Sequence, residues 1–182
     1  MNRTVLAFVA AALVASPVAA QDASANFDGF YAGFYAGASP AGNNPQYQAG
    51  VLAGGRIALS EAYLVGIEAQ FERGNSHGYA SWNGVFTEFQ AGTTVGDNFF
   101  LFGSAGLGGI WQTDPFGDLD EEGFSGPETT FSAEVTVGFG AEFLVNEKVR
   151  VRAQVQRTGE DFEDLISESF SARANAAVLF AF

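Results

Sequence analysis

The sequence contains no cysteine, so neither a disulfide framework nor a thiolate metal site is available to the protein. It has one lysine, Lys148, and one histidine, His77, among 182 residues. So little lysine is unusual for a surface that faces water, where lysine is normally common. After the first 20 residues, no stretch approaches the ~18 consecutive apolar residues that a membrane helix needs. If the protein lies in a membrane, it therefore crosses as β-strands.

Positive charge is also scarce. Eight Lys and Arg residues stand against 21 Asp and Glu residues, which gives a formal net charge of −13. Nucleic-acid-binding domains are typically basic, so we expect no nucleic acid among the partners. A membrane is not excluded, because the positions of the charges matter more than their sum.

The N-terminus has the three parts of a secretory signal peptide. Arg3 supplies a short positive region, residues 5–15 are apolar, and Val18-Ala19-Ala20 provides small residues for cleavage. The apolar part is too short for a membrane-spanning helix. We predict a cleaved signal peptide at residues 1–20 and one domain at residues 21–182.

Apolar and polar side chains alternate through most of the remaining chain, which is typical of β-strands. In residues 170–182, Phe180 and Phe182 share one face with alanines, and Arg173 lies on the other face. Strands of about 9–11 residues with this repeat are the units of transmembrane β-barrels. Eight such segments are recognised, at 29–39, 47–59, 63–73, 82–95, 99–111, 129–145, 149–158 and 170–182.

Short and long connections alternate along the chain. The short turns fall at 60–62, 96–98 and 146–148, and the longer connections at 40–46, 74–81, 112–128 and 159–169. Each short turn has a length that places the apolar faces of the two strands it joins on the same side of the sheet. In the fifth segment both faces carry phenylalanine, and the same rule turns Phe99 and Trp111 outward. This pattern predicts an all-β fold, an eight-stranded antiparallel transmembrane β-barrel with short periplasmic turns. The long, acidic loops would then be displayed at the cell surface.

Two short motifs support this architecture. The stretch Phe27-Asp-Gly-Phe-Tyr-Ala-Gly33 resembles the Gly-Phe-Tyr-x-Gly opening of small eight-stranded outer-membrane barrels of the opacity and surface-antigen type, which are porin-like. The terminal Phe182, with Phe180 and Val178 on its face, is similar to the signal that barrel-assembly machinery recognises. The resemblance implies a location in the bacterial outer membrane. It also implies contact with outer-membrane lipid and lipopolysaccharide, and assembly by that machinery.

Charged residues of inward parity should pair inside the barrel, because an eight-stranded barrel leaves room for little besides side chains. We predict a salt-bridge network centred on Arg150 and Arg152, with Glu68, Glu88 and Glu142 as partners. Arginine suits this role because its planar fork can bind two carboxylates. The alternative is a gated ion path, which a barrel this narrow disfavours. The full inward set is Arg56, Glu68, Glu72, Glu88, Glu134, Glu142, Arg150, Arg152 and Arg173.

Two cations, Arg73 and Arg157, have outward parity and lie near the loop ends of their segments. There they could bind lipopolysaccharide phosphates, or they could simply extend to the membrane interface. Aromatic residues of the same outward face should form two girdles at the membrane interfaces. The expected outer girdle is Tyr47, Phe71, Trp82, Trp111 and Phe131, and the periplasmic one is Tyr63, Phe99, Phe143, Phe180 and Phe182.

Catalytic signals are weak. His77 follows Ser76 in a glycine-rich stretch, but no acid lies close in sequence to orient it. The acidic residues between Asp118 and Gly123 lack the ligand spacing of an EF-hand. We therefore expect no catalytic, cofactor or metal site.

The sequence favours a non-enzymatic barrel that supports the outer membrane and displays acidic loops. A surface adhesin whose loops bind an extracellular ligand is the main alternative. A narrow channel, an enzyme of lipid A and a soluble lipocalin-type barrel are the others. The soluble barrel would turn its apolar face inward, and this would distinguish it from the other candidates, which are all membrane barrels.

Overall fold

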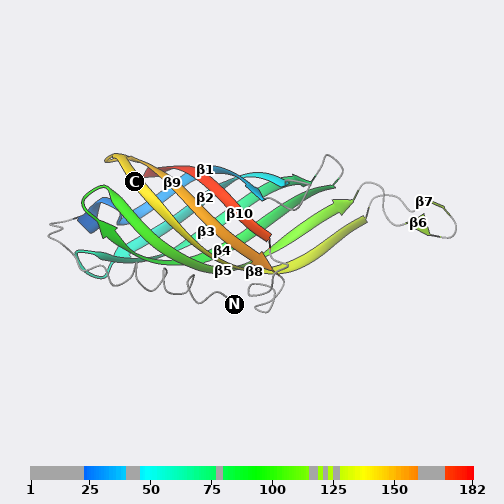
Figure 1. Ribbon diagram of the computed structural model, residues 1–182, viewed down its shortest axis with the longest axis horizontal. Coiled ribbons are helices and arrows are strands. Elements are labelled where there is room, and N and C mark those ends of the chain that lie inside the picture. Colours follow the sequence, from blue (N-terminus) through cyan, green and yellow to red (C-terminus); the bar gives the residue numbers. More distant parts are fainter. Residues whose placement is uncertain are drawn as a thin grey trace.

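The computed structural model describes residues 23–39, 46–76, 80–114, 119–120, 123–124, 128–159 and 171–182. Within them, eight strands close into one antiparallel barrel in the order β1-β10-β9-β8-β5-β4-β3-β2 (Figure 1). The barrel strands are β1 (Gly29–Ser39), β2 (Gln46–Ala58), β3 (Tyr63–Ser76), β4 (Ala80–Val95), β5 (Phe99–Asp114), β8 (Glu128–Asn146), β9 (Val149–Gly159) and β10 (Ser171–Ala181). A separate two-stranded hairpin pairs β6 (Leu119–Asp120) with β7 (Gly123–Phe124).

The barrel closes by pairing its first strand with its last. The pairing of β1 with β10 runs from Tyr31 opposite Ala181 to Ala38 opposite Ala174. Closure supplies hydrogen-bonding partners along both edges of the sheet, so these strands are not left as open edges. The predicted all-β, eight-stranded antiparallel barrel is confirmed. The signal peptide predicted at residues 1–20 lies outside the described residues and stays a prediction.

Several strands are longer than the hydrophobic alternation predicts. Strand β3 continues to Ser76 and β4 begins at Ala80, so most of the predicted connection at 74–81 is strand. The pairing of β5 with β8 likewise continues to Asp114 opposite Glu128. The physical reason is that main-chain hydrogen bonds extend a ladder without needing apolar side chains.

The two faces of the sheet differ sharply in chemistry. Large apolar side chains cover the outside, with Phe30 74% and Leu107 67% exposed. Glutamate, arginine and glutamine side chains lie buried inside. In β5, Phe99 faces outward while Phe100 and Phe102 are buried inside, as the turn register predicts.

The expected position of Trp82 is wrong. The prediction placed it in the outer girdle, but its side chain is buried inside the barrel. Trp82 shares its parity in β4 with the buried Glu88, so the alternation of the strand turns both inward. The other members of the two expected girdles are exposed on the outer face.

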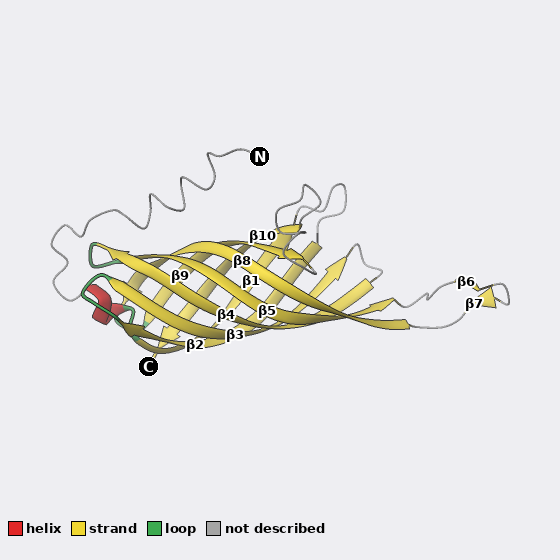
Figure 2. Ribbon diagram, turned by 90° about the horizontal axis from the view of Figure 1, so that it is seen from below, coloured by secondary structure: helices red, strands yellow, loops and turns green. Residues whose placement is uncertain are grey.

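One end of the barrel carries the short turns, together with the 3-10 helix η1 (Ala23–Asn26) (Figure 2). Asn26 Nδ2 donates to the backbone oxygen of Asp97 in one of these turns, at 3.1 Å. Phe27 follows η1 and is fully buried, 5.7 Å from the ring of Phe100. With Leu64 and Phe102 it forms an apolar cluster across this end of the lumen. In the described part of the chain, no helix is long and apolar enough to span a membrane.

Candidate functional site

The lumen holds a cluster of four charged side chains, from β2, β3, β8 and β9. Arg56 Nη2 lies 2.5 Å from Glu142 Oε1, and Arg152 Nη2 lies 2.7 Å from Glu68 Oε2. Arg152 also pairs with Glu142 Oε1 at 2.8 Å, so the four residues form one chain of ion pairs. All four side chains are at most 2% exposed.

Both guanidinium groups bind their carboxylates with two nitrogens. Arg152 donates Nη1 to Glu68 Oε1 at 2.8 Å as well as Nη2 to Oε2. Arg56 donates Nη1 to Glu142 Oε2 at 2.9 Å as well as Nη2 to Oε1. Such bidentate pairs are strong and fix the angle between the groups. They join strands that are not neighbours in the barrel, so the cluster links opposite walls.

Uncharged side chains complete the central cluster. The Tyr31 hydroxyl donates to Glu68 Oε2 at 2.7 Å, and Arg56 donates to Gln90 Oε1 at 2.8 Å. The Arg56 guanidinium also lies over the Tyr31 and Phe100 rings, 4.4 and 4.7 Å from their centroids. Aromatic faces attract cations at these distances. Sequence reasoning missed Tyr31 and Gln90, although parity within their strands would have turned both inward.

A second cluster lies nearer the other end of the lumen. Tyr35 donates its hydroxyl to Glu72 Oε2 at 2.7 Å, and Arg173 forms an ion pair with Glu72 Oε1. The Arg173 guanidinium lies 5.2 Å from the Trp82 ring and 5.4 Å from the Phe86 ring. The inward Trp82 therefore covers a cation of the lumen.

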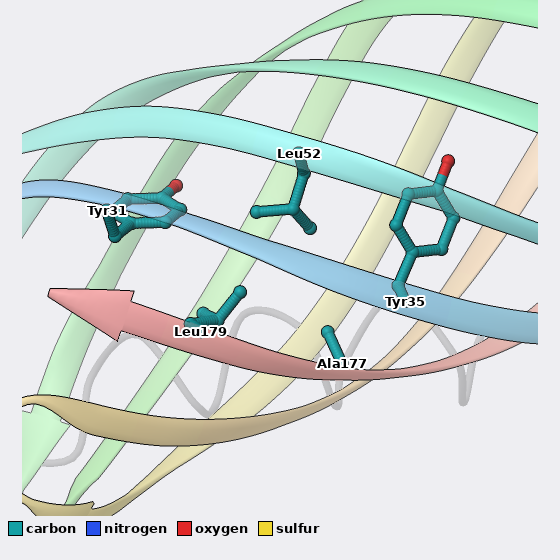
Figure 3. Packing of buried hydrophobic residues seen from close by; sticks show 5 residues of the cluster. All are labelled: Tyr31, Tyr35, Leu52, Ala177 and Leu179. Atoms are coloured by element: carbon teal, nitrogen blue, oxygen red, sulfur yellow. The ribbon is translucent and has the colours of Figure 1, made fainter.

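Apolar residues separate the polar groups along the β1–β10 seam. Figure 3 shows Tyr31 and Tyr35 on the same face of β1, with Leu52, Leu179 and Ala177 beside them. Between the two charged clusters lies a cavity of about 10 Å³, lined in part by Tyr35 and Arg152. That volume is at the lower limit for a single water molecule.

Glu88 has different partners from the ones that were predicted. It is completely buried, and it accepts hydrogen bonds from Thr136 Oγ1 and Gln154 Nε2, each at 3.2 Å, and from Gln156 Nε2. The described residues give it no ion pair with arginine. Glu134, the remaining acid of the inward set, is half-buried and accepts from Ser132 Oγ at 3.0 Å.

Arg150 does not occupy the central position that we predicted for it. It is buried at the end of the barrel that carries η1, where it donates to the Phe27 oxygen at 3.4 Å and lies 5.3 Å from the Phe27 ring. Its Nε has no hydrogen-bond partner among the described residues. Glu142 is opposite Arg152 in the register, whereas Arg150 is two residues, or about 7 Å, further along β9. Glu142 therefore pairs with Arg152 and Arg56 rather than with Arg150.

The two arginines that were predicted to face outward lie on strands that are not neighbours. Arg73 on β3 is exposed and Arg157 on β9 is half-exposed, with β2, β1 and β10 between their strands. On β10, Val178 and Phe180 face outward, 43% and 42% exposed, and Phe182 follows the strand.

The weak catalytic and metal candidates cannot be placed. His77 and Asp118 lie outside the described residues, as does the side chain of Ser76. In the described part of the chain, no group of three or more His, Asp or Glu side chains is arranged to hold a metal ion.

Comparison with known proteins identifies the fold family. The family model of the outer membrane protein beta-barrel domain matches residues 7–176. The chain belongs to this family. The protein is accordingly an outer-membrane β-barrel, and the exposed apolar residues of its outer face contact the hydrocarbon of the bilayer.

Solved outer-membrane barrels have the same architecture. Neisserial surface protein A is 14% identical, with a TM-score of 0.64, over 85% of this chain and 98% of that one. The N-terminal barrel domain of OprF from Pseudomonas aeruginosa is 14% identical with a TM-score of 0.58, over the same shares. Ail, the attachment invasion locus protein of Yersinia pestis, is 11% identical with a TM-score of 0.52, again over 85% and 98%. No curated protein matches the sequence.

Proposed function

We propose that this outer-membrane barrel is a structural, non-enzymatic protein that supports the integrity of the membrane and displays acidic loops. The observation that carries the proposal is the chain of buried ion pairs from Arg56 through Glu142 and Arg152 to Glu68. Opening a path for ions would require breaking this cluster and desolvating its charges separately, which costs several kcal/mol per ion. Side chains therefore plug the lumen.

Conductance across planar bilayers tests the plug. The purified wild-type barrel should give no stable open state. A barrel in which Arg56, Glu68, Glu142 and Arg152 are all replaced by serine keeps its strands but loses the bulk of the plug, and it should conduct. Stable wild-type channels at neutral pH would refute the proposal.

The envelope role needs a cellular measurement. Cells that lack the protein should become more sensitive to detergents and large antibiotics, and the wild-type gene should restore resistance. Complementation by a barrel without its long loops would assign this role to the barrel itself. Unchanged resistance in cells that lack the protein would argue against a structural role.

Lipid contact and assembly follow from the same location. We assign Arg73 and Arg157 to lipopolysaccharide phosphates, because guanidinium groups bind phosphate with two nitrogens. Val178, Phe180 and Phe182 form the apolar face by which assembly machinery would bind the last strand. Replacing both arginines with glutamine should weaken lipopolysaccharide binding without changing the yield of folded barrel, whereas Phe182→Ala should lower that yield.

A surface recognition role is the second candidate, and the hairpin of β5 and β8 favours it. These strands have 16 and 19 residues, more than the 9–11 that span a bilayer. Strand β9 pairs with β8 only from Val135 onward, so residues 128–134 continue on β5 alone. Figure 1 shows β6 and β7 beyond this end of the barrel. The structure of Ail is of its complex with a heparin analogue, sucrose octasulfate. That ligand is anionic, whereas the net charge of −13 here favours a cationic ligand.

Replacing residues 115–127 with a two-residue turn tests recognition. Binding of cells to host or environmental surfaces should fall, while the folded barrel still assembles. Equal binding by the wild-type protein and the variant with the shortened loop would contradict the recognition role and leave only the structural role.

A further inference from the structure

Arg150 is a buried cation that no described carboxylate neutralises. It is 2% exposed, and none of the ion pairs among the described residues includes it. The inward acids Glu68, Glu72 and Glu142 pair with other arginines, and Glu88 accepts from neutral side chains. Burying a charge without a partner is strongly unfavourable. The position therefore favours an anion.

The surroundings of Arg150 provide little polar compensation. In the register, its neighbours are Leu144 on β8 and Leu179 on β10. Nη1 donates to the backbone oxygen of Phe27 at 3.4 Å, which is long for a hydrogen bond. This is its one hydrogen bond within the described part of the chain, and Nε has no partner there. In arginine, Nε and Nη2 form an edge that binds both oxygens of a carboxylate or phosphate. This edge of Arg150 has no acceptor among the described residues.

A short segment, residues 23–28, covers the guanidinium group. The ring of Phe27 is fully buried, with its centroid 5.3 Å from Cζ of the arginine. Asn26 Nδ2 ties the segment to the backbone oxygen of Asp97 by one exposed hydrogen bond. The segment joins β1 at Gly29, whose φ of +92° is a conformation that glycine adopts without strain. Residues 23–28 therefore form a cap that is attached to the barrel at a few points.

The cap is held together by its own backbone. The backbone nitrogens of Phe27 and Asp28 both donate to the oxygen of Ser24, each at 3.0 Å. These two bonds lie within the segment, so they persist when the segment moves as a unit about Gly29. Opening the cap therefore breaks mainly its contacts with the barrel.

The site faces water rather than lipid. Arg150 is the second residue of β9, directly after the short turn at 146–148, and its side chain is buried inside the barrel. The barrel wall separates it from lipid on the outer face. In the orientation proposed above, the short turns face the periplasm, so a solute of that compartment reaches the site. A charged oxygen binds a guanidinium group more strongly than the neutral backbone oxygen of Phe27 does.

We propose that Arg150 binds a small oxyanion, a phosphate or a carboxylate, and that residues 23–28 close this site. Nε and Nη2 hold two oxygens of the anion. The ring of Phe27 covers the guanidinium group in the closed form, so the cap opens before the anion binds. The measured affinity is then reduced in proportion to the small fraction of open barrels. This activity goes beyond the structural role and does not depend on it.

Solution NMR of the full barrel in bicelles, with isotope-labelled arginine, observes each Nε–H group directly. Titration with inorganic phosphate at neutral pH should shift one of these signals in a saturable way. Arg150→Gln should remove both that signal and the response. A parallel titration with acetate shows whether a carboxylate is also bound. Sodium chloride at matched ionic strength should not reproduce the shift.

Two variants of the cap test its role in closing the site. Phe27→Ala should raise the affinity for phosphate about tenfold or more, because it increases the open fraction. Asn26→Ala removes only the exposed bond to Asp97 and should raise the affinity about two- to tenfold. Phe99→Ala is the matched control, because Phe99 is exposed on the outer face at the same end of the barrel and should bind as wild type. Mobility of unboiled samples on SDS gels verifies that every variant is folded.

Four results would overturn the proposal. No saturable response to phosphate or acetate, in wild type or in Phe27→Ala, would mean that the site takes no oxyanion. An equal response to sodium chloride would mean that ionic strength causes the shift. A response that survives Arg150→Gln would place the anion elsewhere. Weaker binding by Phe27→Ala than by wild type would mean that the ring belongs to the site and does not close it.

Discussion

At the scale of single residues, the buried charges inside the barrel are the side chains whose loss of a partner should cost the most stability. Arg152 is the clearest case, because its guanidinium contacts both Glu68 and Glu142 while its side chain is only 2% exposed. A buried charge that loses its partner costs far more than an exposed one. The two carboxylates differ, however, because Glu142 keeps Arg56 when Arg152 is removed.

We expect Arg152→Ala to lower the free energy of unfolding by about 3–5 kcal/mol, since it leaves Glu68 buried without a cation. Adding Glu68→Gln should restore part of this loss by removing the unpaired charge. Adding Glu72→Gln should not, because Glu72 pairs with Arg173 instead. Urea titration of the barrel in lipid vesicles measures all three, and an Arg152→Ala barrel as stable as wild type would contradict the cluster.

Tyr31 provides a milder test at the same carboxylate. Tyr31→Phe removes the hydroxyl that donates to Glu68 and leaves both bonds from Arg152 in place. A hydrogen bond to a charged group contributes about 1.5–3 kcal/mol, so a loss in that range is expected in urea. Tyr47→Phe, on the exposed outer face, should leave stability nearly unchanged. Similar losses for both variants would indicate a general effect of the missing hydroxyl.

At the scale of elements, a short segment before the first strand closes one end of the barrel. Phe27 is fully buried against Phe100, and its backbone oxygen accepts a bond from Arg150. Neither feature follows from strand parity, because Phe27 belongs to no strand. The periodicity of the sequence therefore could not reveal it.

Phe27→Ala should lower the free energy of unfolding by about 3–5 kcal/mol, the range for truncating a buried phenylalanine. Phe27→Leu keeps most of the apolar volume and should cost clearly less. Parallel urea titrations distinguish the two variants. If alanine and leucine have the same small effect, the segment does not seal the barrel end in the membrane.

Strand bounds also belong to this scale, and they were only partly predictable. The register of the short turns correctly turned Phe99 outward and the ambiguous β5 with it. The alternation stopped short of Ser76 in β3 and Asp114 in β5, because main-chain pairing continues where apolar side chains end. The hairpin of β6 and β7 was not predictable in this way, because strands of two residues are too short to show an alternation.

At the scale of the whole molecule, closure is the property with the most direct measurement. Every barrel strand has two neighbours, so no edge is available for the detergent to open first. The unboiled outer-membrane protein should therefore migrate differently on SDS gels from the boiled one. Arg152→Ala should lose the shift at a lower temperature than wild type. Identical migration of boiled and unboiled wild type would contradict a closed, resistant barrel.

The sequence by itself determined the class of the protein, the number of barrel strands and the face on which most side chains lie. These follow from a repeat of two residues, which is local and can be read without knowing the neighbours of a strand. It also identified the buried charges, including Arg56, Glu68, Glu142 and Arg152.

Only the tertiary structure decided which of these charges meet. Arg56 and Glu142 are 86 residues apart and come from strands on different sides of the lumen. Their contact depends on the stagger of all the strands between them, which fixes the level that each inward side chain reaches. Arg150 and Arg152 have the same parity, so the alternation does not distinguish them. The two residues that separate them along β9 nevertheless place Arg152 between two carboxylates and Arg150 against the backbone oxygen of Phe27. A difference of about 7 Å along one strand thus separates an arginine held in ion pairs from one that has no ion pair with any of the described residues, and no local pattern encodes it.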